Sequence, residues 1–391
     1  MKKVLLFSIL LVIGLVLSQY FYIFGEAEET ARLVVRILTM WLLGFIMIHV
    51  GYEFEIDKTR LKSYVVDYGV AATAAGFPWI MVALYFMFVM LPSDTWGRFD
   101  SWTDVLLASR FAAPTSAGVL FSMLAAAGLS GTWFFKKTRI LAIFDDLDTV
   151  LLMIPLKMLI VGLRWQLGVI VLIMIVLLWV AWKYLHKIKL PVSWPWVLTY
   201  AAVITVVSEI IYKVSMLVDD VVPIHIEVLL PAFVLGSILA HPKGHDPHCD
   251  DCHEGHQEGP ETREEQKVST IVSSGFMVMV GLSMPPFMAT FAGNANVNTI
   301  TILLHVLGVT ILANLGKMFP LFVYRKEASL KERLAIGIGM WPRGEVGAGV
   351  LVISLSYGIS GYMVTVAALS LALNLLLTGV FILIVKRLLA R

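Results

Sequence analysis

Two adjacent aspartates, Asp145 and Asp146, interrupt an apolar segment that extends from Ile140 to Ile160. An ionisable side chain at the centre of a membrane-spanning helix costs about 2.5 to 3.5 kcal/mol on insertion scales, so it faces protein or water and marks a functional site. Burial and a second carboxylate nearby both disfavour ionisation, so a cation and a proton compete for such a pair. The two aspartates therefore predict an intramembrane site for ions or protons.

A lysine in another apolar segment lies at a depth that matches the aspartates. Lys317 is about six residues from the inner end of the expected span 299–323, and Asp145 is about seven residues from the inner end of 139–162. Because an intramembrane lysine also needs an opposite charge, we expect Lys317 to pair with Asp145. Two forms of the pair stay open: a static buried ion pair, or one that breaks during a transport cycle.

Two further charges lie near this pair in the sequence. Asp148 follows Asp145 by three positions and so shares its helical face. Arg110 lies one helical turn before Pro114 in the preceding apolar segment, and we expect it to pair with Asp148 because the two spans are sequence neighbours. The sequence leaves open whether Asp148 is a third carboxylate of the ion site.

The composition places these charges in a membrane protein. Of 391 residues, 59% are hydrophobic and 15% are charged, and the mean hydropathy is +0.84. Apolar runs of about twenty residues recur along the chain, which excludes soluble enzyme classes and predicts an all-α polytopic membrane protein. Twelve spans are expected, at 4–24, 32–51, 64–91, 104–127, 139–162, 167–186, 195–217, 222–240, 268–291, 299–323, 334–357 and 361–385.

The short loops predict how the chain crosses the membrane. Lysine and arginine gather in the loops on one side, which the positive-inside rule assigns to the cytoplasm. Both termini are then cytoplasmic, and we expect the protein to lie in the cell (inner) membrane. The net charge of +2 follows from this distribution of basic residues, so we expect no nucleic-acid partner. Residues 1–19 also resemble a cleaved secretory signal, but the apolar run continues to Phe24, so we expect a retained first span.

Two expected spans carry helix breakers at their centres. Pro114 lies within the fourth span, and Pro342 and Gly344 lie within the eleventh. An interior proline removes a backbone hydrogen bond and clashes with the preceding turn, so each span is expected to form two half-helices. The fourth and eleventh spans are expected to cross the membrane in opposite directions. Each is the middle span of a three-span unit, spans three to five and spans ten to twelve. Interrupted spans in two such oppositely directed units mark the binding site of a secondary transporter. Two ordinary proline kinks are the alternative.

Four segments together resemble the cation:proton antiporter superfamily. They occur in the family's order: Gly51–Glu55, Ile143–Asp146, Gly316–Lys317 and Pro342–Gly347. The paired aspartates are similar to the electrogenic branch of bacterial sodium/proton antiporters. The resemblance implies one transmembrane domain of inverted repeats with two crossing broken helices, membrane lipid around it, and a homodimer. The implied ranges are an ion-translocating core mainly at 64–162 and 299–385, and interface or scaffold helices at 4–51 and 167–291.

The resemblance also implies binding roles for single residues. Asp146 would bind the cation or a proton, and Asp145 would pair with Lys317. Thr115 and Ser116, beside the break in the fourth span, match positions that line the family's site.

Two residues of the eleventh span are given a structural role by the same resemblance. Arg343 and Glu345 look like the family's buried arginine and glutamate, which hold the two units in place. Alanine stands at positions 112 and 113, where the family often carries an oxygen ligand. The choice among Na⁺, Li⁺ and K⁺ therefore stays open.

A separate cluster of metal-binding residue types lies in the segment 241–266, which we expect to be a cytoplasmic loop. It holds five histidines and both cysteines. The Cys-x-x-Cys spacing with flanking histidines could hold a Zn²⁺-like ion. The candidate ligands are His248, Cys249, Cys252, His253 and His256. Three roles stay open: a solvated linker, regulatory metal binding, and pH sensing by the histidines.

These patterns together predict a secondary active antiporter and not an enzyme. We expect a monovalent cation, Na⁺ or Li⁺, to be exchanged for protons through the aspartate pair, with no cofactor required. Three alternatives remain: a divalent-metal (zinc) transporter, a K⁺/H⁺ antiporter regulated by the loop, and a membrane sensor that does not transport.

Overall fold

The computed structural model describes residues 2–52, 54, 61–162, 164–218, 224, 226, 228–240, 263–284, 299–344, 346–348, 350–351, 359 and 362–390. Within these ranges the regular structure is helical, apart from one isolated β-bridge between Ile188 and Leu239. The expected all-α fold is thus confirmed.

Long helices make up most of the described chain. They are α1 (Lys2–Ser18), α2 (Glu28–Tyr52), α3 (Leu61–Tyr85), α4 (Phe99–Ser109), α5 (Ala117–Ala126), α6 (Trp133–Val161), α7 (Trp165–Tyr184), α8 (Trp194–Val218), α9 (Leu229–Ile238), α10 (Arg263–Leu282), α12 (Thr299–Gly316), α14 (Leu330–Gly339) and α16 (Tyr362–Leu389). The shorter helical segments are η1 (Phe21–Ala27), η3 (Phe86–Met90), η4 (Ser93–Thr95), η5 (Arg110–Ala112) and α13 (Pro320–Val323).

Several of these segments match the thickness of a bilayer, as a multi-pass membrane protein requires. Among the described residues, seven are long and apolar enough to cross: Glu28–Tyr52, Lys62–Met90, Phe99–Ala126, Trp165–Tyr184, Trp194–Val218, Ile300–Val323 and Tyr362–Leu389. Helix α6 has 29 residues, but its many charged side chains keep it out of this set. The number of twelve spans stays a prediction.

The chain divides into two compact units. The first comprises Met1–Thr39, Lys58–Gly162 and Met277–Arg391, and the second comprises Met40–Asp57 and Leu163–Phe276. Helix α1 belongs to the first unit, where it packs against α16 and α5. The sequence predicts instead that residues 4–51 belong to the interface or scaffold helices.

The second unit contains α7, α8, α9 and the larger parts of α2 and α10. Helix α9 packs against both α7 and α8. The indole Nε1 of Trp41 donates to the carbonyl of Leu198 at 2.9 Å, which joins α2 to α8. None of the described residues that were expected at the ion site lies in this unit.

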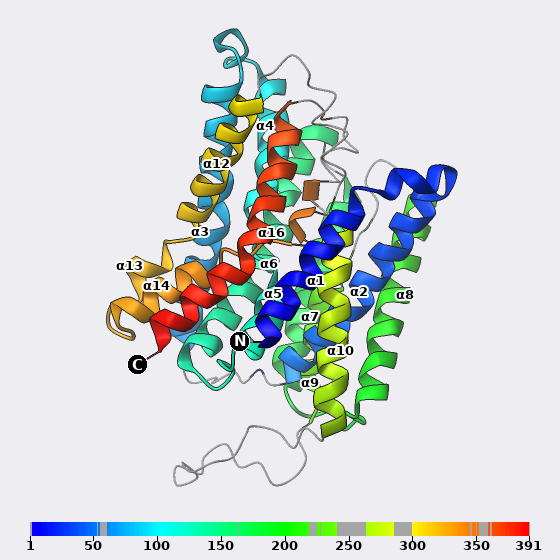
Figure 1. Cartoon of the computed structure of the whole chain (residues 1–391). Helices are drawn as coiled ribbons and strands as arrows, with labels where there is room; N and C mark the ends of the chain where they lie inside the picture. The colour runs from blue at the N-terminus through cyan, green and yellow to red at the C-terminus, as the bar shows by residue number, and fades with distance from the viewer. Residues whose placement is uncertain are drawn as a thin grey trace. The chain divides into compact units, whose positions relative to one another are not determined.

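The first unit contains the same order of elements twice. Each repeat consists of a continuous helix, an interrupted helix and a second continuous helix. In the first repeat these are α3, the interrupted helix formed by α4 and α5, and α6. In the second they are α12, the interrupted segment that begins with α14, and α16. Helix α3 packs against α12 and α6, and α16 packs against α14 and α12. Figure 1 shows α12 running antiparallel to α3 beside it, as an inverted repeat requires.

The two predicted helix breaks are present. Helix α4 ends at Ser109, one turn of 3₁₀ helix follows in η5, and the chain is extended until α5 begins at Ala117. Helix α14 ends at Gly339, and the backbone is non-helical through Gly344 before helix resumes at 346. Proline alone does not cause such a break, because α3 continues through Pro78 and α6 through Pro155.

Candidate functional site

The two breaks contact each other directly at the centre of the first unit. The backbone N–H of Ser116 donates to the carbonyl of Pro342 at 2.9 Å, and the hydroxyl of Thr115 donates to the carbonyl of Met340 at 3.0 Å. A Cβ on Gly344 would lie 3.0 Å from the Ser116 hydroxyl oxygen, so a glycine permits this close approach. Polar backbone groups that a helix would have satisfied internally therefore satisfy one another across the crossing.

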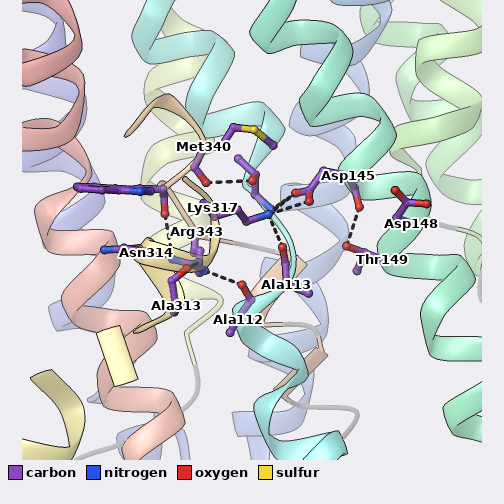
Figure 2. A network of polar contacts seen from close by, with 12 residues as sticks. Ala112, Ala113, Asp145, Asp148, Thr149, Ala313, Asn314, Lys317, Met340 and Arg343 are labelled. Carbon is purple, nitrogen blue, oxygen red and sulfur yellow. Dashed lines mark hydrogen bonds and ion pairs between the residues drawn. The ribbon is translucent and has the colours of Figure 1, made fainter. Parts of the chain in front are cut away.

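Lys317 and Asp145 form an ion pair beside this crossing, as the sequence predicts. The ammonium Nζ of Lys317 lies 2.7 Å from Oδ1 and 2.8 Å from Oδ2 of Asp145, and both side chains are 0% exposed. The ammonium also donates to the carbonyl of Ala113 in the first break, as Figure 2 shows. Asp145 in turn accepts the backbone N–H of Thr115 at 2.7 Å. The pair thus joins the end of α12, the middle of α6 and the first break.

Arg343 holds the second break against the first one and against α12. Its guanidinium donates to the carbonyl of Ala112 at 3.1 Å, to the carbonyl of Ala313 at 2.8 Å, and to the side-chain oxygen of Asn314 at 2.7 Å. The side chain is 1% exposed. These contacts agree with the expected role of Arg343 in geometry, while Glu345 lies outside the described residues.

Asp146 differs from its neighbour in its surroundings. It is 7% exposed, whereas Asp145 is 0% exposed and is held by an ammonium and a backbone amide. Asp146 interacts electrostatically with Lys317 but does not share its short ion pair. The geometry therefore gives the two aspartates unequal environments: Asp145 is held in the ion pair, whereas Asp146 is slightly exposed as a residue and has both carboxylate oxygens buried.

The hydroxyls of Thr115 and Ser116 have structural partners. Thr115 bridges to the second break, and Ser116 caps α5 by accepting the backbone N–H of Val119 at 3.4 Å. Each hydroxyl oxygen retains a lone pair, so ion binding by these residues stays a prediction.

The predicted ion pair between Arg110 and Asp148 is not formed. The Arg110 guanidinium donates instead to the backbone carbonyls of Thr149, at 2.6 Å, and Asp148, at 3.5 Å. It also lies over the Trp79 ring, 4.7 Å from the ring centroid. The prediction was wrong because neighbouring spans place two residues close together, but the direction of each side chain depends on what packs around it.

Several residues at the site were missed by the sequence analysis. Asn314 precedes Lys317 by three positions, so its place on the same face of α12 was a usable signal. Tyr68 and Trp79 of α3 carry no comparable signal, because aromatic residues in an apolar helix are ordinary.

The candidate zinc ligands His248, Cys249, Cys252, His253 and His256 lie outside the described residues. The last four positions of the expected loop, 263–266, form the first turn of α10. Among the residues that the structure describes, no group of three or more histidine, cysteine, aspartate or glutamate side chains is placed to hold a metal ion.

Comparison with solved structures identifies the architecture of the chain. No family model and no curated protein sequence matches the chain. The fold is similar to the structure of the sodium proton antiporter MjNhaP1 from Methanocaldococcus jannaschii, with a TM-score of 0.57 and 16% sequence identity. The similarity covers 96% of this chain and 91% of that one. At this identity the likeness is one of fold, and the chain has the fold of a sodium/proton antiporter.

Proposed function

We propose that this protein is a secondary active antiporter that exchanges a monovalent cation, Na⁺ or Li⁺, for protons, in the electrogenic branch with paired aspartates. The observation that carries the proposal is the buried Lys317–Asp145 pair at the crossing of the two breaks, with the buried carboxylate of Asp146 next to it in the sequence. Broken helices at the centres of inverted repeats are where secondary transporters bind their ions.

The chemistry needs one shared site. A cation that binds the Asp146 carboxylate displaces the proton held there, so the two ions compete and exchange follows. A second proton for each cation makes the exchange electrogenic. One source for it is Asp145, if Lys317 separates from it during the cycle. These groups titrate as a coupled set, so their proton affinities belong to the set.

The remaining features of the proposal concern the setting of the protein. It acts as a homodimer in the cell (inner) membrane, with both termini cytoplasmic and a role in pH homeostasis. Residues 64–162 and 299–385 carry the ion, and residues 4–51 and 167–291 form the interface. The histidine- and cysteine-rich loop binds Zn²⁺ as a regulator, and transport itself uses no cofactor.

Proton flux in proteoliposomes tests the proposal. Na⁺, Li⁺ and K⁺ are supplied in turn, with and without an imposed membrane potential, to the full-length wild type, Asp146→Asn, and the control Asp104→Asn. Asp104 is an exposed carboxylate of α4, so the control makes the same chemical change away from the site. We expect cation-coupled proton flux in the wild type and the control, and its loss in Asp146→Asn.

Each cation and variant has an outcome that decides between functions. Unchanged coupled flux in Asp146→Asn would contradict the proposal. Coupling to K⁺ alone would replace the proposed cation. Zn²⁺ uptake that does not depend on Asp146 would favour a divalent-metal transporter, and Zn²⁺ binding without any ion flux would favour a sensor.

A further inference from the structure

A third carboxylate is buried in α6 one helical turn after the aspartate pair. Asp148 is 3% exposed, and its Oδ2 has no hydrogen-bond partner among the described residues. Figure 2 shows its carboxyl apart from the Lys317–Asp145 pair. The hydroxyl of Tyr68 of α3 hydrogen-bonds this carboxyl, and Arg110 of η5, Asp145 of its own helix and Lys317 act on it electrostatically.

The guanidinium of Arg110 acts on Asp148 and binds no carboxylate among the described residues. It is 0% exposed, and its Nε and Nη1 have no hydrogen-bond partner among the described residues. Its charge is stabilised by the carbonyls of Thr149 and Asp148 and by the face of Trp79. Arg110 therefore has donors free to bind a carboxylate and does not use them on Asp148.

An ionised carboxylate in this position would behave differently. Burying a charge is costly unless it is paired and hydrogen-bonded, and a guanidinium binds a carboxylate through two parallel hydrogen bonds. A negatively charged Asp148 would therefore draw Arg110 into a direct ion pair. The observed arrangement, with Arg110 on backbone carbonyls, fits a neutral, protonated Asp148.

We propose that Asp148 carries the second proton of the transport cycle and that Arg110 is its counterion. Asp148 holds its proton in the arrangement described here. When a cation binds at Asp146, the O–H bond of Asp148 breaks, the proton passes to water, and the guanidinium of Arg110 turns from the carbonyls to the new carboxylate. This inference rests on the proposed antiport function.

Two physical reasons support Asp148 over Asp145 as the source of this proton. Releasing a proton from Asp145 and returning it requires Lys317 to leave a pair that is 0% exposed and held by further bonds to Ala113 and Thr115. Among the described residues Asp148 has a hydrogen bond from Tyr68 but no ion pair that must break. A cation at the aspartate pair also adds positive charge nearby, which favours the ionised form of a neighbouring carboxyl.

Counting released protons tests this role directly. Saturating NaCl is added to the purified full-length protein in weakly buffered detergent solution with a pH indicator, with choline chloride as the blank. We expect Asp148→Asn to release about one proton fewer than the wild type, because one protonatable group of the coupled set is gone. Asp148→Glu should restore the release, and the control Asp104→Asn should match the wild type.

The outcomes separate this inference from the function on which it rests. If Asp148→Asn releases as many protons as the wild type, the role of Asp148 is refuted while antiport stands. The antiport proposal itself fails if the wild type releases no protons on Na⁺ addition, or if Asp146→Asn releases as many protons as the wild type. Should Asp148→Asn not fold, Tyr68→Phe keeps the carboxyl and removes a hydroxyl that faces it. The pH of half-maximal release should then shift, and an unshifted value would refute the role.

Discussion

Lys317 and Asp145, which are 172 positions apart in the sequence, meet in a bidentate ion pair with no exposed surface on either side chain. The same ammonium binds the carbonyl of Ala113, and the same carboxylate binds the N–H of Thr115. One ion pair therefore connects α6 and the end of α12 to the first break. The stability of the first unit and the geometry of the proposed site depend on the same few atoms.

Removing one member of this pair should destabilise the protein more than removing both. Lys317→Ala leaves a buried carboxylate without its counterion, and we expect it to lower the free energy of unfolding by about 3 to 5 kcal/mol. The double variant Lys317→Met, Asp145→Leu replaces both charges with apolar groups, so it should be more stable than Lys317→Ala. Thermal unfolding in detergent measures both effects, and Lys326→Ala, on the exposed loop after α13, serves as control. A double variant no more stable than the single would contradict this prediction.

Arg343→Lys should weaken the crossing even though it preserves the charge. The guanidinium donates hydrogen bonds to Ala112, Ala313 and Asn314 at the same time. The single ammonium group of a lysine cannot reach all three acceptors, because they are placed to fit the planar guanidinium. A buried acceptor left without a donor costs about 1 to 3 kcal/mol, so a fall in unfolding temperature is expected. The matched change at an exposed arginine, Arg325→Lys, should have little effect. Equal unfolding temperatures for the two variants would show that the fork is not needed.

Gly316→Ala should disturb the lysine by pushing α12 away from α3. A Cβ at Gly316 would lie 2.6 Å from the Cα of Pro78, and backbone at that distance cannot yield cheaply. Overpacking of this kind typically costs about 1 to 3 kcal/mol, and the displaced helix end carries Lys317. Gly69→Ala, in the neighbouring helix α3, is the control, because a Cβ there meets no atom within 4 Å. Thermal stability and proton flux should both fall in the first variant only.

The stability of the protein should decrease at alkaline pH through Tyr324. Burial, followed by the charge of Asp67, raises the pKa of this tyrosine above its ordinary value of 10.0. The hydroxyl donates to Asp67 at 2.7 Å, and Asp67 also binds Lys137 at 2.9 Å. Below about pH 10 the contribution to stability is complete, and above it the unfolded chain loses the proton first, so the free energy of unfolding falls.

Unfolding temperatures between about pH 7 and pH 11 measure this contribution. Tyr324→Phe should lose about 1 kcal/mol at neutral pH with its hydrogen bond and should show a shallower alkaline decline. Tyr200→Phe removes a phenol hydroxyl in α8 and should keep the wild-type slope. An unchanged slope in Tyr324→Phe would assign the decline to other groups.

Much of the site was predictable because local rules place its parts. Pro114 and Pro342 mark the two breaks. The pairing of Lys317 with Asp145 was predicted from their similar depth in two different spans. Depth is a one-dimensional quantity, however, and it cannot say which way a side chain turns. Arg110 shows the limit, since it lies near Asp148 as expected but donates to backbone carbonyls.

Proline by itself was an incomplete signal. Pro78 and Pro155 lie inside helices that continue. Around Pro114 and Pro342 the backbone is non-helical, and the two segments are joined by hydrogen bonds. The difference lies in whether another segment supplies partners for the freed backbone groups. That supply comes from parts of the chain that are far apart in the sequence.

The sequence by itself determined the all-α membrane architecture, the positions of the two breaks and the identity of the charged residues. Apolar run length and the cost of an intramembrane charge are local properties, so they can be read from composition and spacing. Only the tertiary structure decided which carbonyls Lys317 and Arg343 bind, that Asp145 and not Asp146 forms the short pair with Lys317, and that, among the described residues, Asp148 Oδ2 and two nitrogens of Arg110 have no hydrogen-bond partner. These contacts depend on how distant helices pack, which no local pattern specifies.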